Sequence, residues 1–145
     1  MKLSHKPAAI KVALCLYLVS LGVGILLIAA EYMIGEEFPA NSGVITTVIS
    51  AMTVGIWFGY KSGQLMSRKT RWYALLLWSA ISIAQMIILL IVDGISLYEF
   101  VDELGWFSLL IVATAIPMLV IAYFIFKSGE KMGIKSVLKN QAKQG

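Results

Sequence analysis

The chain has 145 residues and a formal net charge of +4, and 59% of its residues are hydrophobic while only 14% are charged. A soluble domain carries about 25% charged residues, so most of this protein's surface does not face water. The single cysteine, Cys15, excludes an internal disulfide and a cysteine metal site, and the single histidine, His5, lies alone in the N-terminal tail. We therefore expect no metal and no cofactor.

Four apolar segments have the length that crossing a bilayer requires. A hydrocarbon core of about 30 Å needs about 20 apolar residues in a helix, and each such segment must be helical because in lipid it can satisfy its backbone groups only internally. The sequence predicts an all-α fold: a single polytopic transmembrane domain over residues 1–145, built as a four-helix bundle of two tandem helical hairpins. The expected spans are about residues 12–30, 43–60, 72–92 and 105–126, followed by a basic tail at 127–145.

The first segment follows three lysines, as a secretory signal would. Its 19 residues exceed the apolar core of about 7–15 residues that such signals have, and no A-x-A cleavage site follows. We interpret it as a retained span. Ser20 and Gly24 give it one pair of small residues at four-residue spacing.

The second segment carries small residues at every fourth position. This spacing places one narrow strip along a helix, where backbones approach closely, and close packing drives helix association in lipid. The strip is either an interface with a second copy or a membrane partner, or an internal packing surface of this chain. Asn41 or Ser42 can cap the helix. The strip consists of Gly43, Thr47, Ala51, Gly55, Gly59 and Gly63.

The third segment has Ser79, Ser82 and Gln85 on one face. A carboxamide near the bilayer centre should face protein rather than lipid. The face is either part of a polar path or the site of an interhelical hydrogen bond. In the fourth segment Pro117 removes a backbone donor, so we expect a kink there.

Two short regions flank the fourth span. Between spans three and four, Ser96 and Glu99 match the S-x-x-E capping box, which predicts a short amphipathic helix on the membrane surface; an irregular loop is the alternative. In the tail the lysines recur every four residues beside a small apolar face, which is typical of a basic helix lying on anionic lipid. Nucleic-acid binding is not expected from a tethered tail without aromatics. These lysines are Lys127, Lys131, Lys135, Lys139 and Lys143.

The charges are divided completely between the connecting segments. All 12 lysines and arginines lie before span one, between spans two and three, or after span four, while the other two loops contain only acidic charges. Glu130 is the single acidic residue on the basic side. The positive-inside rule then places both termini in the cytoplasm.

The two halves of the sequence align without a gap at an offset of 66 residues. The segment Phe58-Gly59-Tyr60-Lys61-Ser62-Gly63 falls on Phe124-Ile125-Phe126-Lys127-Ser128-Gly129. This favours an internal repeat, two hairpins related by an axis along the membrane normal. Chance similarity between two apolar helices with basic ends is the alternative.

No catalytic pattern accompanies these spans. Proton-coupled carriers usually need an ionisable group inside the membrane, and the span interiors have none. We therefore expect a non-enzymatic membrane protein that acts through helix association with itself or with a membrane partner, as accessory subunits and immunity proteins do. The alternative is a small transporter or channel for an uncharged or apolar solute.

Three stretches resemble a group of four-span bacterial inner-membrane proteins of similar length and unassigned activity. They are Asn41-Ser42-Gly43, Gly59-Tyr60-Lys61 and the segment from Arg71 to Ser82. The resemblance covers the whole chain in topology and implies the bacterial inner membrane. It implies no mechanism.

Overall fold

The computed structural model describes residues 9–35, 42–94 and 96–144, and these residues contain helices and turns but no strand. The expected all-α class is therefore confirmed for this part of the chain. The structure has four long helices and one short helix: α1 (Ala9–Ile34), α2 (Ser42–Ser62), α3 (Arg68–Val92), α4 (Leu97–Leu104) and α5 (Phe107–Gln144).

The four long helices are each long and apolar enough to cross a membrane, which makes this a multi-pass membrane protein. Several of these helices begin or end at residues that commonly cap helices. Gly35 and Gly63 follow α1 and α2 with φ values of 73° and 63°, a conformation in which glycine ends helices without strain. Ser67 begins α3 by accepting a hydrogen bond from the Thr70 backbone N–H.

The capping box predicted for the short helix is present. Ser96 Oγ accepts a hydrogen bond from the Glu99 N–H, and the Glu99 carboxylate accepts one from the Ser96 N–H, both at 3.1 Å. These bonds satisfy two N–H groups that a helix start leaves open. The segment after Ser96 is therefore the helix α4 rather than an irregular loop.

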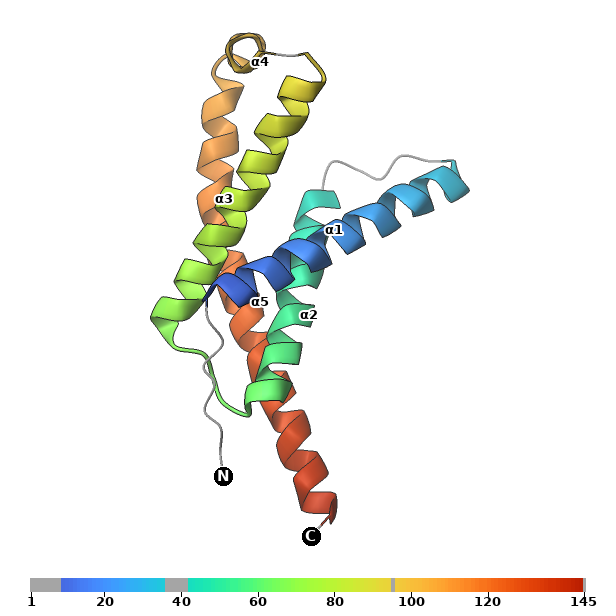
Figure 1. Cartoon of the computed structure of the whole chain (residues 1–145), viewed down its shortest axis with the longest axis vertical. Helices are drawn as coiled ribbons and strands as arrows, with labels where there is room; N and C mark the ends of the chain where they lie inside the picture. The colour runs from blue at the N-terminus through green and yellow to red at the C-terminus, as the bar shows by residue number, and fades with distance from the viewer. Residues whose placement is uncertain (1–8, 36–41, 95, 145) are drawn as a thin grey trace.

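The last helix extends beyond the expected fourth span. At about 1.5 Å per residue, the 38 residues of α5 reach about 57 Å, nearly twice the hydrocarbon thickness. The basic tail continues the same helix, so it is not a separate helix as the sequence pattern suggested. Pro117 lies inside α5, and the axis of the helix changes direction in its middle part (Figure 1).

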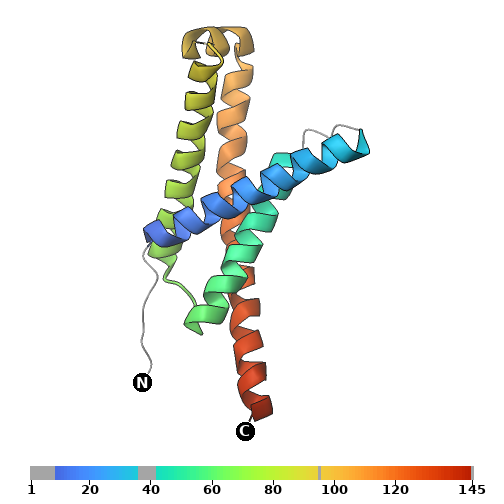
Figure 2. The ribbon, with the colours of Figure 1, turned by 45° about the vertical axis from the view of Figure 1, so that its right-hand side comes forward.

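The helices form a splayed arrangement rather than four parallel rods. The most extensive contact joins α2 and α5, which run in the same direction. Helix α1 crosses α2 and the first part of α3 steeply in both ribbon views, whereas the later part of α3, α4 and the first part of α5 stand apart as a hairpin (Figures 1 and 2). Helix α1 also packs against α2 and against α3, and α3 packs more sparsely against α5, whereas the helices α2 and α3 do not pack against each other.

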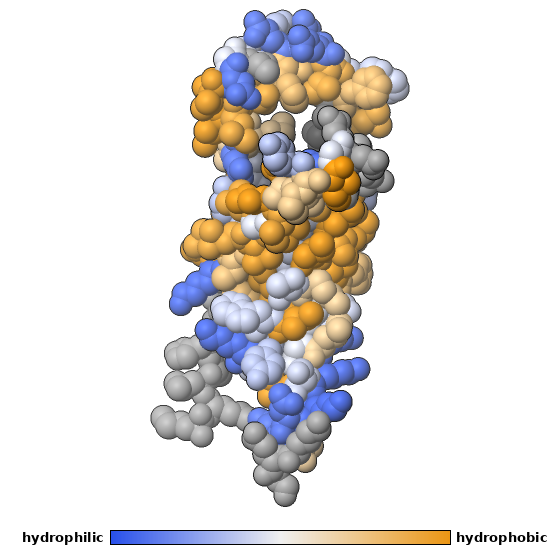
Figure 3. Space-filling view, turned by 90° about the vertical axis from the view of Figure 1, so that its right-hand side faces the viewer, coloured by the Kyte–Doolittle hydropathy of each residue, from blue (hydrophilic) through white to orange (hydrophobic). Residues whose placement is uncertain are grey.

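The two ends of the molecule differ in charge. The basic end is where α2 ends and α3 begins, with Lys61, Arg68 and Lys69; the acidic end lies around α4, with Asp93 and Glu99. Hydrophobic side chains dominate the middle of the face in Figure 3, and hydrophilic ones gather at both ends. This distribution matches a protein whose middle faces lipid.

The buried core is confined to the basic half, the half of the molecule next to the basic end. It takes residues from the beginning of α1 and α3, the second half of α2 and the part of α5 after Pro117. In the acidic half the same helices diverge and their apolar side chains are exposed. The core residues are Val12, Ala13, Leu16, Ala51, Val54, Phe58, Ala74, Leu75, Trp78, Ala122, Tyr123 and Phe126.

Candidate functional site

The α2–α5 contact is made by glycines of α2 against the backbone of α5. A Cβ atom added to Gly55 would lie 2.5 Å from the Phe126 carbonyl oxygen, and one added to Gly59 would overlap the Glu130 backbone. Any larger residue would therefore push the two helices apart. Ala51, one turn before Gly55, is fully buried.

The contact is reciprocal, because α5 brings two glycines of its own. A Cβ on Gly129 would lie 2.7 Å from the Met52 carbonyl oxygen, and one on Gly133 would meet the Ile56 carbonyl. Two G-x-x-x-G segments thus face each other, an arrangement that allows close helix approach in lipid. The second segment lies in the basic tail, where the sequence showed its spacing although we expected no packing there.

The predicted small-residue strip has different roles along its length. Gly55 and Gly59 pack inside the chain. Gly63 ends the helix at positive φ, and open space surrounds the Cβ positions of Gly43 and Gly63. Thr47 donates a hydrogen bond to the Gly43 carbonyl at 2.9 Å. Of the two possible caps of α2, Asn41 and the side chain of Ser42 lie outside the described residues.

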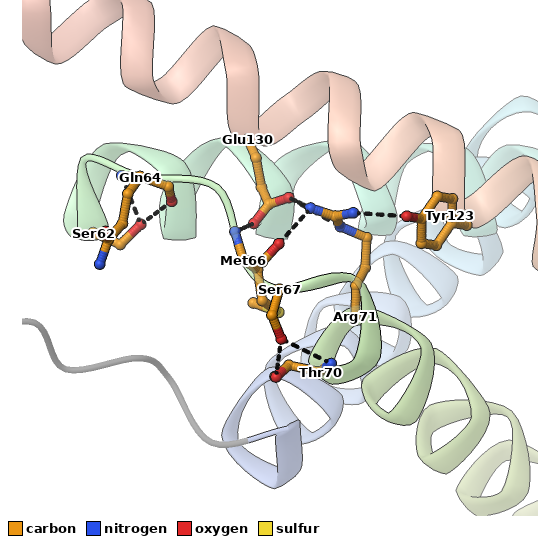
Figure 4. A network of polar contacts seen from close by, with 8 residues as sticks. All are labelled: Ser62, Gln64, Met66, Ser67, Thr70, Arg71, Tyr123 and Glu130. Atoms are coloured by element: carbon orange, nitrogen blue, oxygen red, sulfur yellow. Dashed lines mark hydrogen bonds and ion pairs between the residues drawn. The ribbon is translucent and has the colours of Figure 1, made fainter.

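A buried ion pair lies beside the glycine contact (Figure 4). Arg71, near the start of α3, donates from Nε and Nη2 to Glu130 Oε2 on α5, at 3.0 and 2.5 Å. The side chains are only 3% and 1% exposed. A bidentate guanidinium–carboxylate pair has the geometry that a buried charge pair requires.

The remaining polar atoms of this pair are also satisfied. Glu130 Oε1 accepts from the Met66 N–H at 2.9 Å, while Arg71 Nη2 donates to the Met66 carbonyl and Nη1 donates to the Tyr123 hydroxyl, both at 3.0 Å. The Tyr123 ring stacks on Trp72 at a centroid distance of 4.8 Å. A cavity of about 20 Å³ beside Glu130 has room for about one water molecule.

This ion-pair cluster, Met66, Arg71, Tyr123 and Glu130, connects the α2–α3 loop, α3 and α5 at one point. The charge pattern of the sequence placed Arg71 among the basic residues between spans two and three and did not predict its pairing with Glu130. The available signal was Glu130, the single acidic residue on the basic side. Every donor and acceptor around it serves the fold, so we interpret the cluster as structural.

The acidic half contains an open groove between α1, α2 and α3. Its volume is about 480 Å³, and a second hollow of about 170 Å³ continues from it between α2, α3 and α5. Trp78, Ser82 and Thr47 line both spaces. The groove walls are completed by apolar side chains of α1 and by small or polar residues, among them Ser20, Gly24, Gly43 and Gln85.

The polar face predicted on α3 lies at these hollows: Ser79 lines the smaller, Gln85 the larger and Ser82 both. The hydroxyls of Ser20 and Ser82 donate to the carbonyls of Tyr17 and Trp78 on their own helices. Gln85 differs from them, because its partly buried carboxamide has no hydrogen-bond partner within the part of the chain that the structure describes. Among the described polar side chains that line the larger groove, Gln85 alone has no such partner.

The tail lysines mostly point away from the protein. Lys131, Lys135 and Lys139 are exposed, Lys127 is partly buried, and the side chain of Lys143 lies outside the described residues. Among the described residues, no group of three histidine, cysteine, aspartate or glutamate side chains comes together.

Comparisons of the chain with protein-family models, with curated proteins and with solved structures found no match.

Proposed function

We propose that this is a non-enzymatic inner-membrane protein that acts by associating, through its acidic half, with a second copy or with a membrane partner. The observation that carries the proposal is the unsatisfied Gln85 carboxamide in an open groove at membrane depth. Polar side chains in membrane helices face other protein groups rather than lipid. The groove replaces the glycine strip as the proposed association surface, since Gly55 and Gly59 are occupied within the chain.

The proposed orientation has the basic end and both termini in the cytoplasm of a bacterial cell. The charge partition supports it, since the lysines and arginines gather at one end. The exposed lysines of the α5 extension would then meet the anionic inner leaflet, where each contributes about 1 kcal/mol. The resemblance to four-span inner-membrane proteins supports the choice of membrane.

The proposed internal repeat agrees with the pattern of helix contacts. The 66-residue offset relates α2 to the first part of α5 and most of α1 to α3. Each helix packs against its repeat counterpart, α2 on α5 and α1 on α3, and each hairpin packs within itself. This is the set of contacts that a pseudo-twofold axis along the membrane normal would produce.

The test is native mass spectrometry of the tagged full-length protein, extracted from its own membrane in a mild detergent. A fixed homo-oligomer or a stoichiometric membrane partner is expected, and Gln85→Leu should reduce either assembly. A monomer without a partner that conducts a solute in liposomes would overturn the proposal.

The size of the groove favours one second candidate function, transport of a small uncharged solute. Its volume of about 480 Å³ falls within the range of about 300–1,000 Å³ typical of ligand sites, and its lining combines apolar walls with a few polar groups. Solute flux in proteoliposomes that Gln85→Leu reduces would favour this function. A flat trace across neutral solutes would contradict it.

A further inference from the structure

We infer that the groove is a homodimer contact in which the Gln85 carboxamides of two copies pair across a twofold axis along the membrane normal. This inference rests on the proposed function and names its partner as a second copy of this chain. It starts from Gln85 because, among the described polar side chains that line the groove, its carboxamide alone has no hydrogen-bond partner within the described residues.

The occupant of the groove must offer both a donor and an acceptor. A carboxamide has two N–H donors and a carbonyl acceptor, and leaving them unpaired in an apolar medium costs free energy. A lipid acyl chain fills volume but supplies no hydrogen bond. The neighbouring hydroxyls of Ser20 and Ser82 already donate to their own helices, so the demand for a polar partner comes from Gln85.

A second copy meets this demand by symmetry. Two copies inserted in the same direction place their Gln85 side chains at the same depth, and a twofold axis that passes beside Gln85 brings the two carboxamides face to face. The partial charges of one carboxamide, positive at nitrogen and negative at oxygen, are complementary to those of another. An unrelated partner would need a matching polar group at that depth.

The walls of the groove allow a helix to approach. Open space surrounds the Cβ positions of Gly24 on α1 and Gly43 on α2, and both glycines line the groove. Small residues at an interface let helix backbones come close in lipid. The apolar side chains around the groove, including Ile25 and Ile28 at 66% exposure each, supply surface that a second copy would cover.

Crosslinking within the native membrane tests this pairing. On a Cys15→Ala background that retains Gln85, Ser82→Cys, which lies one turn before Gln85 and lines the same groove, is compared with Ile83→Cys on another face of the helix. Ile83 is 55% exposed, so it is the matched control at nearly the same depth. A short membrane-permeant bifunctional thiol reagent is used, because paired glutamines hold backbones farther apart than a disulfide spans.

The expected result is a crosslinked homodimer with Ser82→Cys at a yield several-fold higher than with Ile83→Cys. Native mass spectrometry should show a wild-type dimer that Gln85→Leu reduces at least tenfold in abundance and Gln85→Asn preserves in part. Equal crosslinking at both positions, or a dimer that Gln85→Leu leaves intact, would overturn the inference. Crosslinking of Ser82→Cys to a different protein would overturn the homodimer while leaving the proposed function standing, and a partnerless monomer would overturn both.

Discussion

Arg71 and Glu130, 59 residues apart in the chain, form a bidentate ion pair that is almost completely buried between α3 and α5. Glu130 also presents its backbone to Gly59 of α2. One residue of α5 thus holds a charge partner on one neighbouring helix and a close backbone contact on another. The ion-pair cluster and the glycine contact therefore meet at Glu130.

Removing one partner of the ion pair should strongly destabilise the protein. Arg71→Met and Glu130→Gln each leave a buried group without its partner, and breaking a buried pair costs about 3–5 kcal/mol. The double variant Arg71→Met/Glu130→Met should lose less than the sum of the single losses. Unfolding in detergent micelles measures this, with the exposed Arg68→Met as the control. Additive effects would mean that the two side chains are not coupled.

The Tyr123 hydroxyl should contribute less to the stability of the fold than the ion pair does, and its contribution can be measured separately. Tyr123→Phe keeps the ring that stacks on Trp72 but removes the hydroxyl that accepts from Arg71. We expect a loss of about 1.5–3 kcal/mol in the free energy of unfolding, the range for a hydrogen bond involving a charged group. The exposed Tyr73→Phe on α3 is the matched control and should change little. A similar loss of stability in Tyr123→Phe and Tyr73→Phe would argue against the hydrogen bond between Arg71 and Tyr123.

Substituting the α2 glycines that face α5 should destabilise the protein, whereas substituting a glycine that faces open space should not. Gly59→Ala places a methyl group against the Glu130 backbone, whereas Gly43→Ala meets open space. Overpacking costs about 1–3 kcal/mol, so Gly59→Ala should destabilise by at least this amount and Gly55→Leu by more. Gly43→Ala should be neutral or slightly stabilising. Unfolding in detergent micelles measures the stability of each variant. Equal losses for Gly59→Ala and Gly43→Ala would contradict the close packing of α2 against α5.

Removal of the Ser50 hydroxyl, unlike the substitutions above, should not destabilise the protein. Ser50 is fully buried on α2, and its Oγ has no hydrogen-bond partner among the described residues. Because an unsatisfied buried hydroxyl costs free energy, Ser50→Ala should be neutral or stabilise by up to about 1 kcal/mol. Ser67→Ala, which removes the α3 cap, should instead lose about 1 kcal/mol. A clear loss from Ser50→Ala would reveal a partner for this hydroxyl.

The proposed orientation can be checked by labelling. On the Cys15→Ala background, a thiol reagent that cannot cross the inner membrane should label Glu103→Cys, at the acidic end, in cells with a permeabilised outer membrane. Lys139→Cys, at the basic end, should react only after the inner membrane is opened. Both positions are exposed, so a difference reports topology rather than burial. The reverse pattern would invert the proposed orientation.

The sequence predicted the spans well because length and hydropathy are local properties. The expected starts and ends of the first three spans lie within four residues of the ends of α1, α2 and α3. The Ser96–Glu99 capping box predicted α4 for the same reason, since all its atoms lie within one helical turn. The helix that contains the predicted fourth span is longer than that span, because the lysines after Phe126 indicated a separate surface tail while α5 continues to Gln144.

Which side chains of different helices contact each other could not be predicted from such local properties. The strip on α2 indicated close packing, and Gly129 and Gly133 had the matching spacing, yet the pattern alone left open whether the partner was inside the chain. Their pairing depends on how α2 and α5 cross, which is set by all their contacts together. The same is true of Gln85, whose lack of a partner depends on how far α1 diverges from α3.

By itself the sequence determined that the chain is helical, that four segments can cross a membrane and that its charges divide between two ends, since each follows from residue type and spacing along one helix. The tertiary structure decided that the glycines of α2 face those of α5, that Arg71 meets Glu130 and that the acidic half stays open around Gln85. Such contacts join residues more than 50 positions apart, and chain connectivity does not bring those residues together. Only the packing of whole helices does, because each contact requires the backbones to be at the right separation and angle first.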